Sequence, residues 1–292
     1  MRKAFGWKRH ALAVVVTIGA ALATGQTTHA DDRDGLPGFG LAGLRVIGLT
    51  DDGRLVRFRA DAPRRTRDIG YVAGLTGTDS RLIGIDFRVQ DGKLYGVGNG
   101  GGVYTIETTT AQATFVNALT VPLSGTFFGV DFNPAADRLR IISDTGQNLA
   151  HNVITGGATA MNSALTYTAP PATPVTALGL TGAAYTNNDP DAATGTTLFD
   201  LDTTLDQVVI QSPPGAGILV ATGKFGVDAG PQAGFDIYSL GARGTTSVNL
   251  AFASLIVNGK SGFYRIVLTT GSAVRLGTFD EMVVDIAVAL NQ

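Results

Sequence analysis

The sequence predicts an all-β protein, a β-propeller of five four-stranded blades. The first observation is a structural unit at Phe128–Asn148, where an apolar strand, a Pro-centred turn, a second apolar strand and a polar turn follow one another. The first strand of this unit recurs, with spacings of 45, 53 and 52 residues between its glycines, Gly84, Gly129, Gly182 and Gly234. Repeats of roughly 45–50 residues with four short strands each are typical of a β-propeller.

Composition is the second observation. Glycine accounts for 39 of 292 residues, about twice its usual share of ~7%. Many glycines between short apolar runs indicate many tight turns, which favours β structure. Hydrophobic residues make up 44% of the chain, enough for a substantial core, and there is no cysteine. Stability must therefore come from packing rather than from disulfides.

The repeats divide the chain into five units. The first begins at Leu44 with three strands, RVIGLT, RLVRFRA and DIGYVAG, and its basic cluster Arg64, Arg65 and Arg67 is expected in a solvated loop. Three arginines on one edge are too few to indicate a polyanion partner. The later units start at Leu82, Phe128, Leu180 and Gly234, and a Pro-containing loop (Ala169–Pro174) precedes the fourth. Strands such as RLRIISD and FYRIVL have apolar residues on both faces, as expected for sheets stacked around an axis.

The two ends of the chain are expected to close the ring. The first unit lacks an inner strand, and the final segment, MVVDIAVAL, is an inner strand with nothing after it. Joining the two makes one complete blade and a total of five. A sixth blade would require splitting the 161–181 connection or the fifth unit.

The N-terminus resembles a secretory signal peptide. Residues 1–30 combine a basic start, the apolar run Ala11–Ala23 and the small-residue ending Thr28-His29-Ala30. The apolar run is shorter than the ~20 residues that a membrane-spanning helix needs. We therefore expect a signal peptide (1–30), a flexible lead-in (31–43) and a single propeller domain (44–292) in an extracytoplasmic setting, secreted or periplasmic.

Charge and histidine content restrict the chemistry. Without the four basic residues of the leader the chain keeps 18 basic and 24 acidic residues, a net charge of −6 and no footprint for nucleic acid. His151 is then the only histidine, which argues against zinc and against a Ser-His-Asp triad, so no catalytic or metal-binding residue is assigned. Calcium needs only oxygen ligands and stays possible. Its candidates are Asp51, Asp52, Asp144, Gln147, Asn148, Asn187–Asp191, Asp200, Asp202 and Asp206, none with the spacing of a calcium loop.

Four repeated aspartates, Asp86, Asp131, Asp236 and Asp285, fall on the expected inner strands, whereas the fourth unit has Ala184 in that place. One interpretation is an acidic ring that holds a cation or a polar ligand. The other is that each carboxylate accepts hydrogen bonds from backbone N–H groups of a neighbouring turn and locks one blade to the next. Repetition in nearly every blade favours the structural interpretation.

Polar runs that break the symmetry are better candidates for a ligand site. They are 144–148, 185–188 and the loop 211–215. From these we predict a ligand-binding set: Asp144, Gln147, Asn148, Asn187 and Asn188.

The sequence also resembles a known family, the exported bacterial β-propellers with the uncharacterised DUF4394 domain. The matching segments are GVDFNPAADRLRIISDTGQN (129–148), GAAYTNN (182–188), TTLFDLD (196–202), QSPPGAG (211–217) and GFDI (234–237). Ala150 and Val153 depart from the family pattern at a turn. The resemblance implies the propeller fold and an extracytoplasmic setting, and it implies no activity and no catalytic residues.

Three hypotheses about function remain open at this point. The first is a non-catalytic binding or interaction module that uses loops at one end of the ring and binds a small polar ligand or a protein. The second is a hydrolase or lyase with a carboxylate-based, calcium-assisted site at the mouth of the channel. The third is a structural role at the cell surface. The fold alone does not choose among them.

Overall fold

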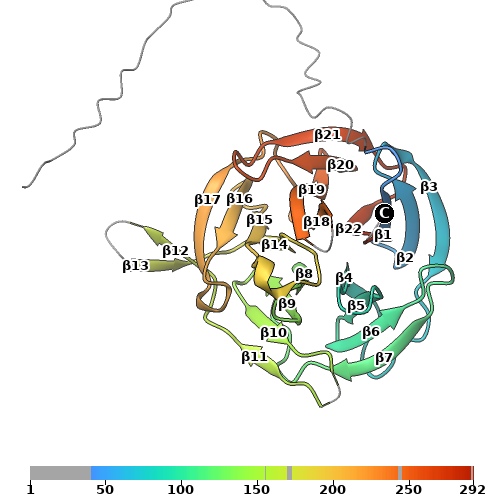
Figure 1. Cartoon of the computed structure of the whole chain (residues 1–292), viewed down its shortest axis with the longest axis horizontal. Helices are drawn as coiled ribbons and strands as arrows, with labels where there is room; N and C mark the ends of the chain where they lie inside the picture. Colours follow the sequence, from blue (N-terminus) through green and yellow to red (C-terminus); the bar gives the residue numbers. More distant parts are fainter. Residues whose placement is uncertain (1–40, 155, 170–172, 243–244, 291) are drawn as a thin grey trace, which may run out of the picture. The chain divides into compact units, whose positions relative to one another are not determined.

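The protein is a five-bladed β-propeller, as predicted (Figure 1). The computed structural model describes residues 41–154, 156–169, 173–242, 245–290 and 292. Within these ranges helical structure is confined to two short 3₁₀ turns, η1 (Ala192–Thr194) and η2 (Pro214–Ala216). The expected signal peptide and most of the expected lead-in lie outside the described residues.

Each blade is an antiparallel sheet whose first strand faces the axis of the ring. From the axis outward, blade 1 contains β22 (Val283–Val288), β1 (Arg45–Thr50), β2 (Arg54–Arg59) and β3 (Ala62–Tyr71). Blade 2 contains β4 (Leu82–Phe87), β5 (Leu94–Gly98), β6 (Gly102–Ile106) and β7 (Ala113–Ala118). Blade 3 contains β8 (Phe128–Asn133), β9 (Arg138–Ser143), β10 (Asn148–His151) and β11 (Thr159–Met161). Blade 4 contains β14 (Leu180–Tyr185), β15 (Leu198–Asp202), β16 (Gln207–Gln211) and β17 (Ile218–Lys224), and blade 5 contains β18 (Ala233–Ala242), β19 (Thr245–Val257), β20 (Lys260–Ile266) and β21 (Ala273–Thr278).

Blade 1 closes the ring with strands from both ends of the chain, as the sequence predicted. The C-terminal strand β22 pairs antiparallel with β1, placing Val46 opposite Val288 and Gly48 opposite Ile286. Because these strands are more than 200 residues apart in sequence, their pairing holds the first and last parts of the propeller together in one sheet.

The basic cluster Arg64, Arg65 and Arg67 lies in strand β3, so the prediction of a loop was wrong. The segment pairs with β2 over most of its length, and Arg67 lies opposite Arg57. Its sequence, APRRTR, has neither the apolar alternation nor the β-branched content that marks a strand. Pairing with β2 therefore outweighs the weak local preference.

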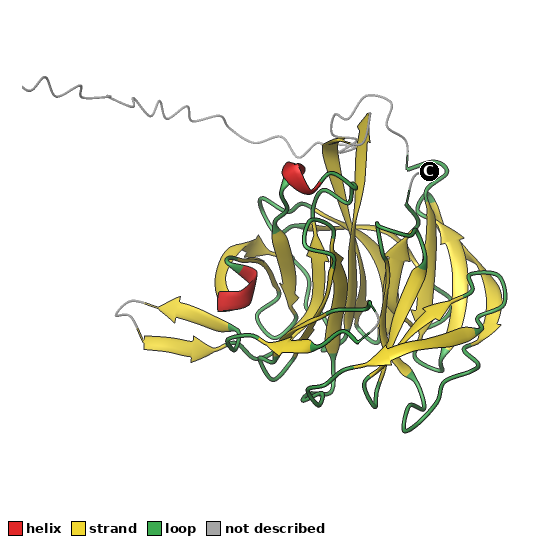
Figure 2. Ribbon diagram, turned by 60° about the horizontal axis from the view of Figure 1, so that its bottom comes forward, coloured by secondary structure: helices red, strands yellow, loops and turns green. Residues whose placement is uncertain are grey.

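The connection before the fourth unit contains a hairpin of β12 (Thr166–Ala169) and β13 (Thr173–Thr176). The predicted loop Ala169–Pro174 was therefore wrong where it overlaps these strands, and residues 170–172 lie outside the described residues. Strand β12 also pairs in parallel with β17, so the sheet of blade 4 has six strands. The hairpin projects from the outer edge of that blade (Figures 1 and 2).

The core lies between the blades. Successive side chains of a strand point to opposite faces, so one strand serves two interfaces: in β15, Leu198 packs toward blade 3 and Leu201 toward blade 5. Between blades 1 and 2 the core includes Ile47, Leu55 and Ile85. This arrangement explains why apolar residues occur on both faces of strands within a blade.

We expect a charge in the closing strand to unfold the ring. Ile286 is 1% exposed in β22, so Ile286→Asp buries an unpaired carboxylate and should lower the free energy of unfolding by about 4 kcal/mol or more. Val274 in β21 is 50% exposed, and Val274→Asp should change stability by less than about 0.5 kcal/mol. Urea denaturation followed by circular dichroism measures both, and equal effects of the two variants would contradict the closure described above.

Candidate functional site

The repeated aspartates link each inner strand to the next. Every one accepts a hydrogen bond from a backbone N–H of the neighbouring blade: Asp285 from Ile85 (2.7 Å), Asp86 from Phe132 (2.7 Å), Asp131 from Tyr185 (2.9 Å) and Asp236 from Val288 (2.5 Å). The donor lies on the neighbouring inner strand rather than in a turn. The structural interpretation of these residues is confirmed, and blade 4, with Ala184, has no such carboxylate to offer blade 5.

Glycines on the inner strands allow these links to form. A Cβ atom added to Gly84 would lie 2.5 Å from the side chain of Val130, and one added to Gly129 would lie 2.6 Å from the backbone nitrogen of Ala183. No side chain fits at such distances, so glycine is required where neighbouring inner strands approach one another.

The carboxylates also gather at the axis. Oxygen atoms of Asp86, Asp131 and Asp236 lie within 4.8 Å of one another, and Oδ1 of Asp131 has no hydrogen-bond partner among the described residues. Burial raises the pKa of Asp236 to about 6, and it raises the pKa of Asp86 and Asp131 well above the usual value, with further contributions from the neighbouring carboxylates. The cluster is therefore an acidic group that resists full ionisation.

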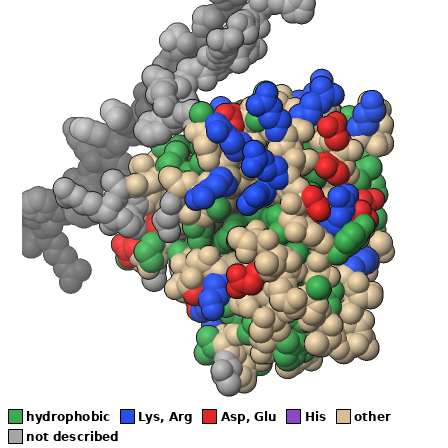
Figure 3. Space-filling model, turned by 90° about the vertical axis from the view of Figure 1, so that its right-hand side faces the viewer, with side chains coloured by type: hydrophobic (Ala, Val, Ile, Leu, Met, Phe, Trp, Pro, Cys, Tyr) green, Lys and Arg blue, Asp and Glu red, His purple; other side chains and the backbone are tan. Residues whose placement is uncertain are grey.

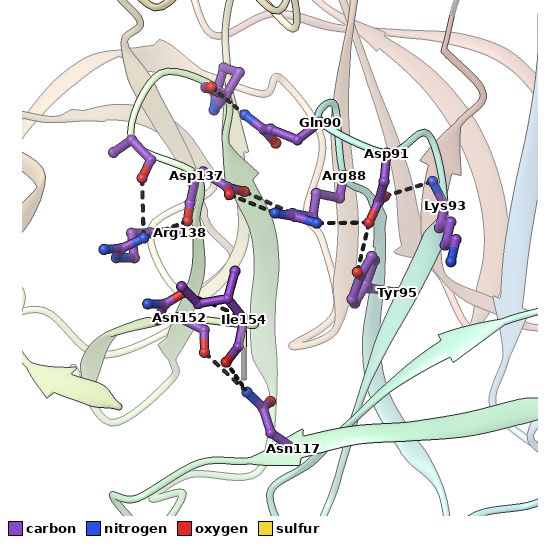
Figure 4. Close-up of polar contacts among 12 residues, drawn as sticks. Arg88, Gln90, Asp91, Lys93, Tyr95, Asn117, Asp137, Arg138, Asn152 and Ile154 are labelled. Carbon is purple, nitrogen blue, oxygen red and sulfur yellow. Dashed lines mark hydrogen bonds and ion pairs between the residues drawn. The ribbon is translucent and has the colours of Figure 1, made fainter. Parts of the chain in front are cut away.

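The interface of blades 2 and 3 is held by polar contacts (Figure 4). Arg88 donates through Nε (2.8 Å) and Nη2 (2.6 Å) to the carboxylate of Asp137, and through Nη1 to Asp91 (2.7 Å). The hydrogen bonds to Asp137 and Asp91 raise the pKa of Arg88 despite its partial burial. A bidentate pair of this kind fixes the relative position of two blades.

His151 is a structural residue of the same interface. Its Nε2 lies 2.9 Å from Oδ1 of Asn117 and its Nδ1 lies 3.0 Å from the hydroxyl of Thr159. Asn117 in turn donates to the carbonyls of Asn152 and Ile154 (Figure 4). Burial, with the charge of Arg138, lowers the pKa of His151 to about 4, so the ring is neutral at pH 7. Both nitrogens are occupied, which leaves neither for proton transfer to a substrate.

The predicted ligand residues of blade 3 stabilise a turn. Asp144 accepts a hydrogen bond from the N–H of Thr126 (2.9 Å). Gln147 accepts from the N–H of Ser124 (2.9 Å) and donates to the carbonyl of Pro122 (2.8 Å). These contacts attach the segment 122–126 to the turn between β9 and β10.

The predicted residues of blade 4 join it to blade 5. Asn187 exchanges two hydrogen bonds with Asn249 (2.9 and 2.8 Å), and Asn188 donates to the carbonyl of Ile237 (2.7 Å). They follow the first strand of their blade, whereas the turn at 144–147 follows the second strand of blade 3. Because consecutive strands in a blade are antiparallel, the two runs lie at opposite ends of the ring and do not form one site.

Asn148 lies apart from the other four, at the interface of blades 3 and 4. Its Oδ1 accepts from Nη1 of Arg140 (2.6 Å), and its Nδ2 donates to the carbonyl of Pro214 (2.9 Å).

Asp200 and Gln211 are fully buried on the strands of blade 4, and both oxygens of Asp200 and Oε1 of Gln211 have no partner among the described residues. Burial raises the pKa of Asp200 well above its usual value, and the charge of Arg140 opposes the rise. Such enclosed groups are typical partners of interior water.

A cleft between blades 1 and 2 is lined by arginines. Its cavity volume is about 900 Å³, and its charged lining consists of Arg45, Arg57, Arg59, Arg65, Arg67 and Asp61. All five arginines are exposed, and the formal charge of this set is +4. Figure 3 shows a concentration of Lys and Arg side chains on this side of the molecule. The cleft is thus an accessible and strongly basic concavity.

The arginines occupy positions that would otherwise extend the core. Leu55 of β2 is buried against blade 2, and strand alternation puts Arg57 and Arg59 on the same face. Arg57 lies between Ile47 of β1 and Arg67 of β3. The cavity opens where apolar side chains give way to guanidinium groups.

Two like-charged pairs in this cleft oppose folding. Arg57 lies directly across from Arg67, and Arg45 directly across from Arg59. Such cross-strand pairs of like charge are destabilising. Arg59 is compensated by Asp61, with Nη2 and Oδ2 2.8 Å apart. Arg57 and Arg67 have no side-chain hydrogen bond or ion pair with another described residue, so their charges remain available to a ligand.

Sequence reasoning missed Arg45, Arg57 and Arg59. The available signal was the spacing of two residues in Arg57–Arg59 and again in Arg65–Arg67, which puts each pair on one face of a strand. Recognising it required β3 to be identified as a strand.

Comparison with known proteins identifies a family of unknown function. A family model described as "Domain of unknown function (DUF4394)" matches residues 54–287. No curated protein matches the sequence. None of the helices among the described residues has the length and apolar content needed to cross a membrane.

Several solved structures are similar at low identity. An auxiliary nutrient binding protein from Bacteroides ovatus is 14% identical, with 61% of this chain and 46% of that chain covered and a TM-score of 0.36. A structure from work on the de novo evolutionary emergence of a symmetrical protein is 14% identical, covering 85% and 100% of the two chains at a TM-score of 0.47. A protein from Lactobacillus plantarum is 15% identical, covering 80% and 66% at 0.36. The match thus spans about half the length of the first structure, and no function follows from likenesses at this level.

The axial carboxylates should make stability depend on pH. Because burial raises the pKa of Asp236 from 3.8 to about 6, the native state holds this proton more tightly than the unfolded chain. The contribution of Asp236 to the free energy of unfolding should then fall as the pH rises from about 4 to about 6, by about 1.4 kcal/mol per pKa unit. Asp236→Asn keeps an oxygen acceptor for the N–H of Val288 but cannot ionise, so its stability should fall less over this range.

Urea denaturation of both proteins across this pH range measures the difference. His151 acts in the opposite direction, because its lowered pKa makes stability fall as the pH drops from about 6.5 to about 4. That contribution is common to both proteins and cancels in the comparison. Parallel curves for the two proteins would refute the assignment of the pH dependence to Asp236.

Proposed function

The chain belongs to the DUF4394 family, a domain of unknown function. We propose that it is a non-catalytic binding propeller whose ligand is an anion held between blades 1 and 2. The observation that carries this proposal is the arginine-lined cleft. Its volume of about 900 Å³ lies within the ~300–1,000 Å³ of typical ligand sites. A binding role also explains why two destabilising like-charge pairs are present at positions that could hold core residues.

The chemistry of the cleft supports binding rather than catalysis. A guanidinium group stays protonated and offers only donors, in a planar fork that matches carboxylate and phosphate. The acidic member of the lining, Asp61, is paired with Arg59. The hydrogen bond from Arg59 lowers the pKa of Asp61, so this carboxylate is a poor proton donor or acceptor near neutral pH.

The setting proposed for this binding is extracytoplasmic. It rests on the leader-like pattern of residues 1–30, which lie outside the described residues. Ligand binding by Asp144, Gln147, Asn148, Asn187 and Asn188 stays a prediction. Since the first two and the last two of these residues make backbone or inter-blade hydrogen bonds at opposite ends of the ring, we propose the arginine cleft as the principal site.

A second candidate function is a hydrolase or lyase with a calcium-assisted carboxylate site at the axis. It is favoured by one observation, the convergence of Asp86, Asp131 and Asp236 with an unpartnered oxygen on Asp131. Calcium accepts carboxylate oxygens at such mutual distances. Against it, all three side chains are buried and each holds a backbone N–H, so a substrate has little access.

A calcium titration decides between the two functions. A ligand of the native state raises the melting temperature, so the enzyme hypothesis requires a rise with added calcium, reversed by a chelator and absent in Asp131→Asn. Under the binding proposal we expect the melting temperature of wild type to be unchanged by calcium. A rise that Asp131→Asn removes would favour the second function.

Loss of single arginines should weaken anion binding. We expect Arg57→Ala and Arg67→Ala each to weaken binding of citrate or pyrophosphate about tenfold or more at low ionic strength, since a charge-assisted contact contributes about 1.5–3 kcal/mol. Removing one member of a like-charge pair should at the same time leave thermal stability equal or higher. Isothermal titration calorimetry and thermal melts measure the two effects.

Arg81→Ala is the matched control, because Arg81 is also exposed but does not line the cleft. The proposal fails if wild type binds neither anion, or if Arg81→Ala weakens binding as much as Arg57→Ala does.

A further inference from the structure

A second basic cavity adjoins the arginine cleft. Its volume is about 640 Å³, and its charged lining consists of Asp61, Arg64, Arg65 and Arg275. Arg275 comes from β21 of blade 5, so this cavity lies between blades 5 and 1, on the other side of β3. Asp61, Ala62 and Arg65 line both cavities, which makes them neighbours along the outer edge of blade 1.

One strand, β3, contributes arginines to both cavities. Arg64 lines only the cavity between blades 5 and 1, Arg67 lines only the cleft between blades 1 and 2, and Arg65 lines both. The linings of the two cavities together form a basic band across β1, β2 and β3 of blade 1 and β21 of blade 5: Arg45, Arg57, Arg59, Arg64, Arg65, Arg67 and Arg275. Figure 3 shows this concentration of basic side chains over one side of the ring.

Among the described residues, few acidic groups pair with the arginines of the band. Asp61 pairs with Arg59, and Asp280 lies 3.9 Å from Nε of Arg64 with both side chains at least 70% exposed. An exposed pair at that distance contributes little. The band thus keeps most of its positive charge although the whole chain is acidic.

We propose that a linear acidic polysaccharide lies along this basic band, from the cleft between blades 1 and 2 to the cavity between blades 5 and 1, and places carboxylate or sulfate groups in both cavities. This deepens the proposed function and rests on it. Two adjoining basic cavities with a shared arginine suit a ligand whose negative charges repeat along a chain. Arginine forks recognise such planar or tetrahedral oxyanions through paired hydrogen bonds.

Two other polyanions fit the band less well. Single-stranded nucleic acid is held by exposed aromatic rings on which bases stack. The aromatic residues that line the first cavity, Phe58 and Phe87, are only 4% and 8% exposed, and the described lining of the second contains none. An anionic membrane is bound by a surface that adds exposed apolar side chains to basic ones, whereas these arginines line concave cavities.

The test compares digalacturonate, which fits within one cavity, with long oligogalacturonides, using the full chain and isothermal titration calorimetry. When one charged group of a ligand is bound in the first cavity, its other charged groups are at high local concentration near the second cavity, which raises the affinity of a ligand long enough to reach both. We expect the long ligand to bind about tenfold or more tightly than the short one. Arg64→Ala and Arg275→Ala should remove this gain while leaving the affinity for digalacturonate unchanged, and Arg57→Ala should weaken both ligands.

The outcomes separate this inference from the proposed function. Equal affinities for short and long ligands, or an equal loss for both in Arg275→Ala, would overturn the extended site and leave the anion cleft intact. Failure of wild type to bind any anion would overturn both. An oligonucleotide or anionic vesicles bound as tightly as the long oligogalacturonide, at the same ionic strength, would overturn the choice of polysaccharide. Arg81→Ala is again the control for nonspecific loss of charge.

Discussion

The propeller depends on the close approach of its five inner strands. The inner strand of each blade has one edge that faces the axis and pairs with no other strand, and the N–H groups of that edge are buried. In blades 1 to 4 the aspartate of a neighbouring blade accepts a hydrogen bond from one of them, as Asp86 does from Phe132. Leaving a buried donor unsatisfied is costly, which explains why carboxylates are retained where burial and mutual repulsion disfavour their charge.

Glycines allow the inner strands of neighbouring blades to approach one another closely around the axis. Farther from the axis, the interfaces between blades differ in their chemistry. Blades 2 and 3 are joined by the ion pair of Arg88 with Asp137. Blades 3 and 4 enclose the polar groups of Arg140, Asn148 and Asp200. Blades 1 and 2 combine an apolar inner half with an open basic outer half. The same repeated architecture thus contains interfaces of different chemistry, and the one between blades 1 and 2 is open to a ligand.

The sequence was sufficient to predict the five-bladed fold and the way its two ends close the ring. A repeated glycine and aspartate at a nearly constant spacing identified the inner strands, and the unmatched strands at the two ends identified the closing blade. The opposite placement of Asp144 and Asn187 could also have been deduced, because it follows from the antiparallel order of strands within a blade. The ligand-binding prediction grouped these residues by polarity without applying that order.

The register that brings the arginines into one basic cleft could not be predicted from the sequence, although their spacing was a signal for a shared strand face. The cleft depends on the register of three strands, which places Arg57 between Ile47 and Arg67. The pairing of β2 with β3 shifts register between Leu55 and Val56 and again between Arg57 and Arg59, and a shift of one residue would send these side chains to the other face. Neither spacing nor composition reports such irregularities.

The like-charged pairs of β1, β2 and β3 have a consequence for the lifetime of the protein. Repulsion between Arg57 and Arg67 weakens the sheet when the cleft holds no anion, and a bound oxyanion would reverse that repulsion. Proteases cut the population of molecules that have opened, and a ligand of the closed form depletes that population. The half-life of the chain would then follow the local supply of its ligand, with unliganded molecules degraded first.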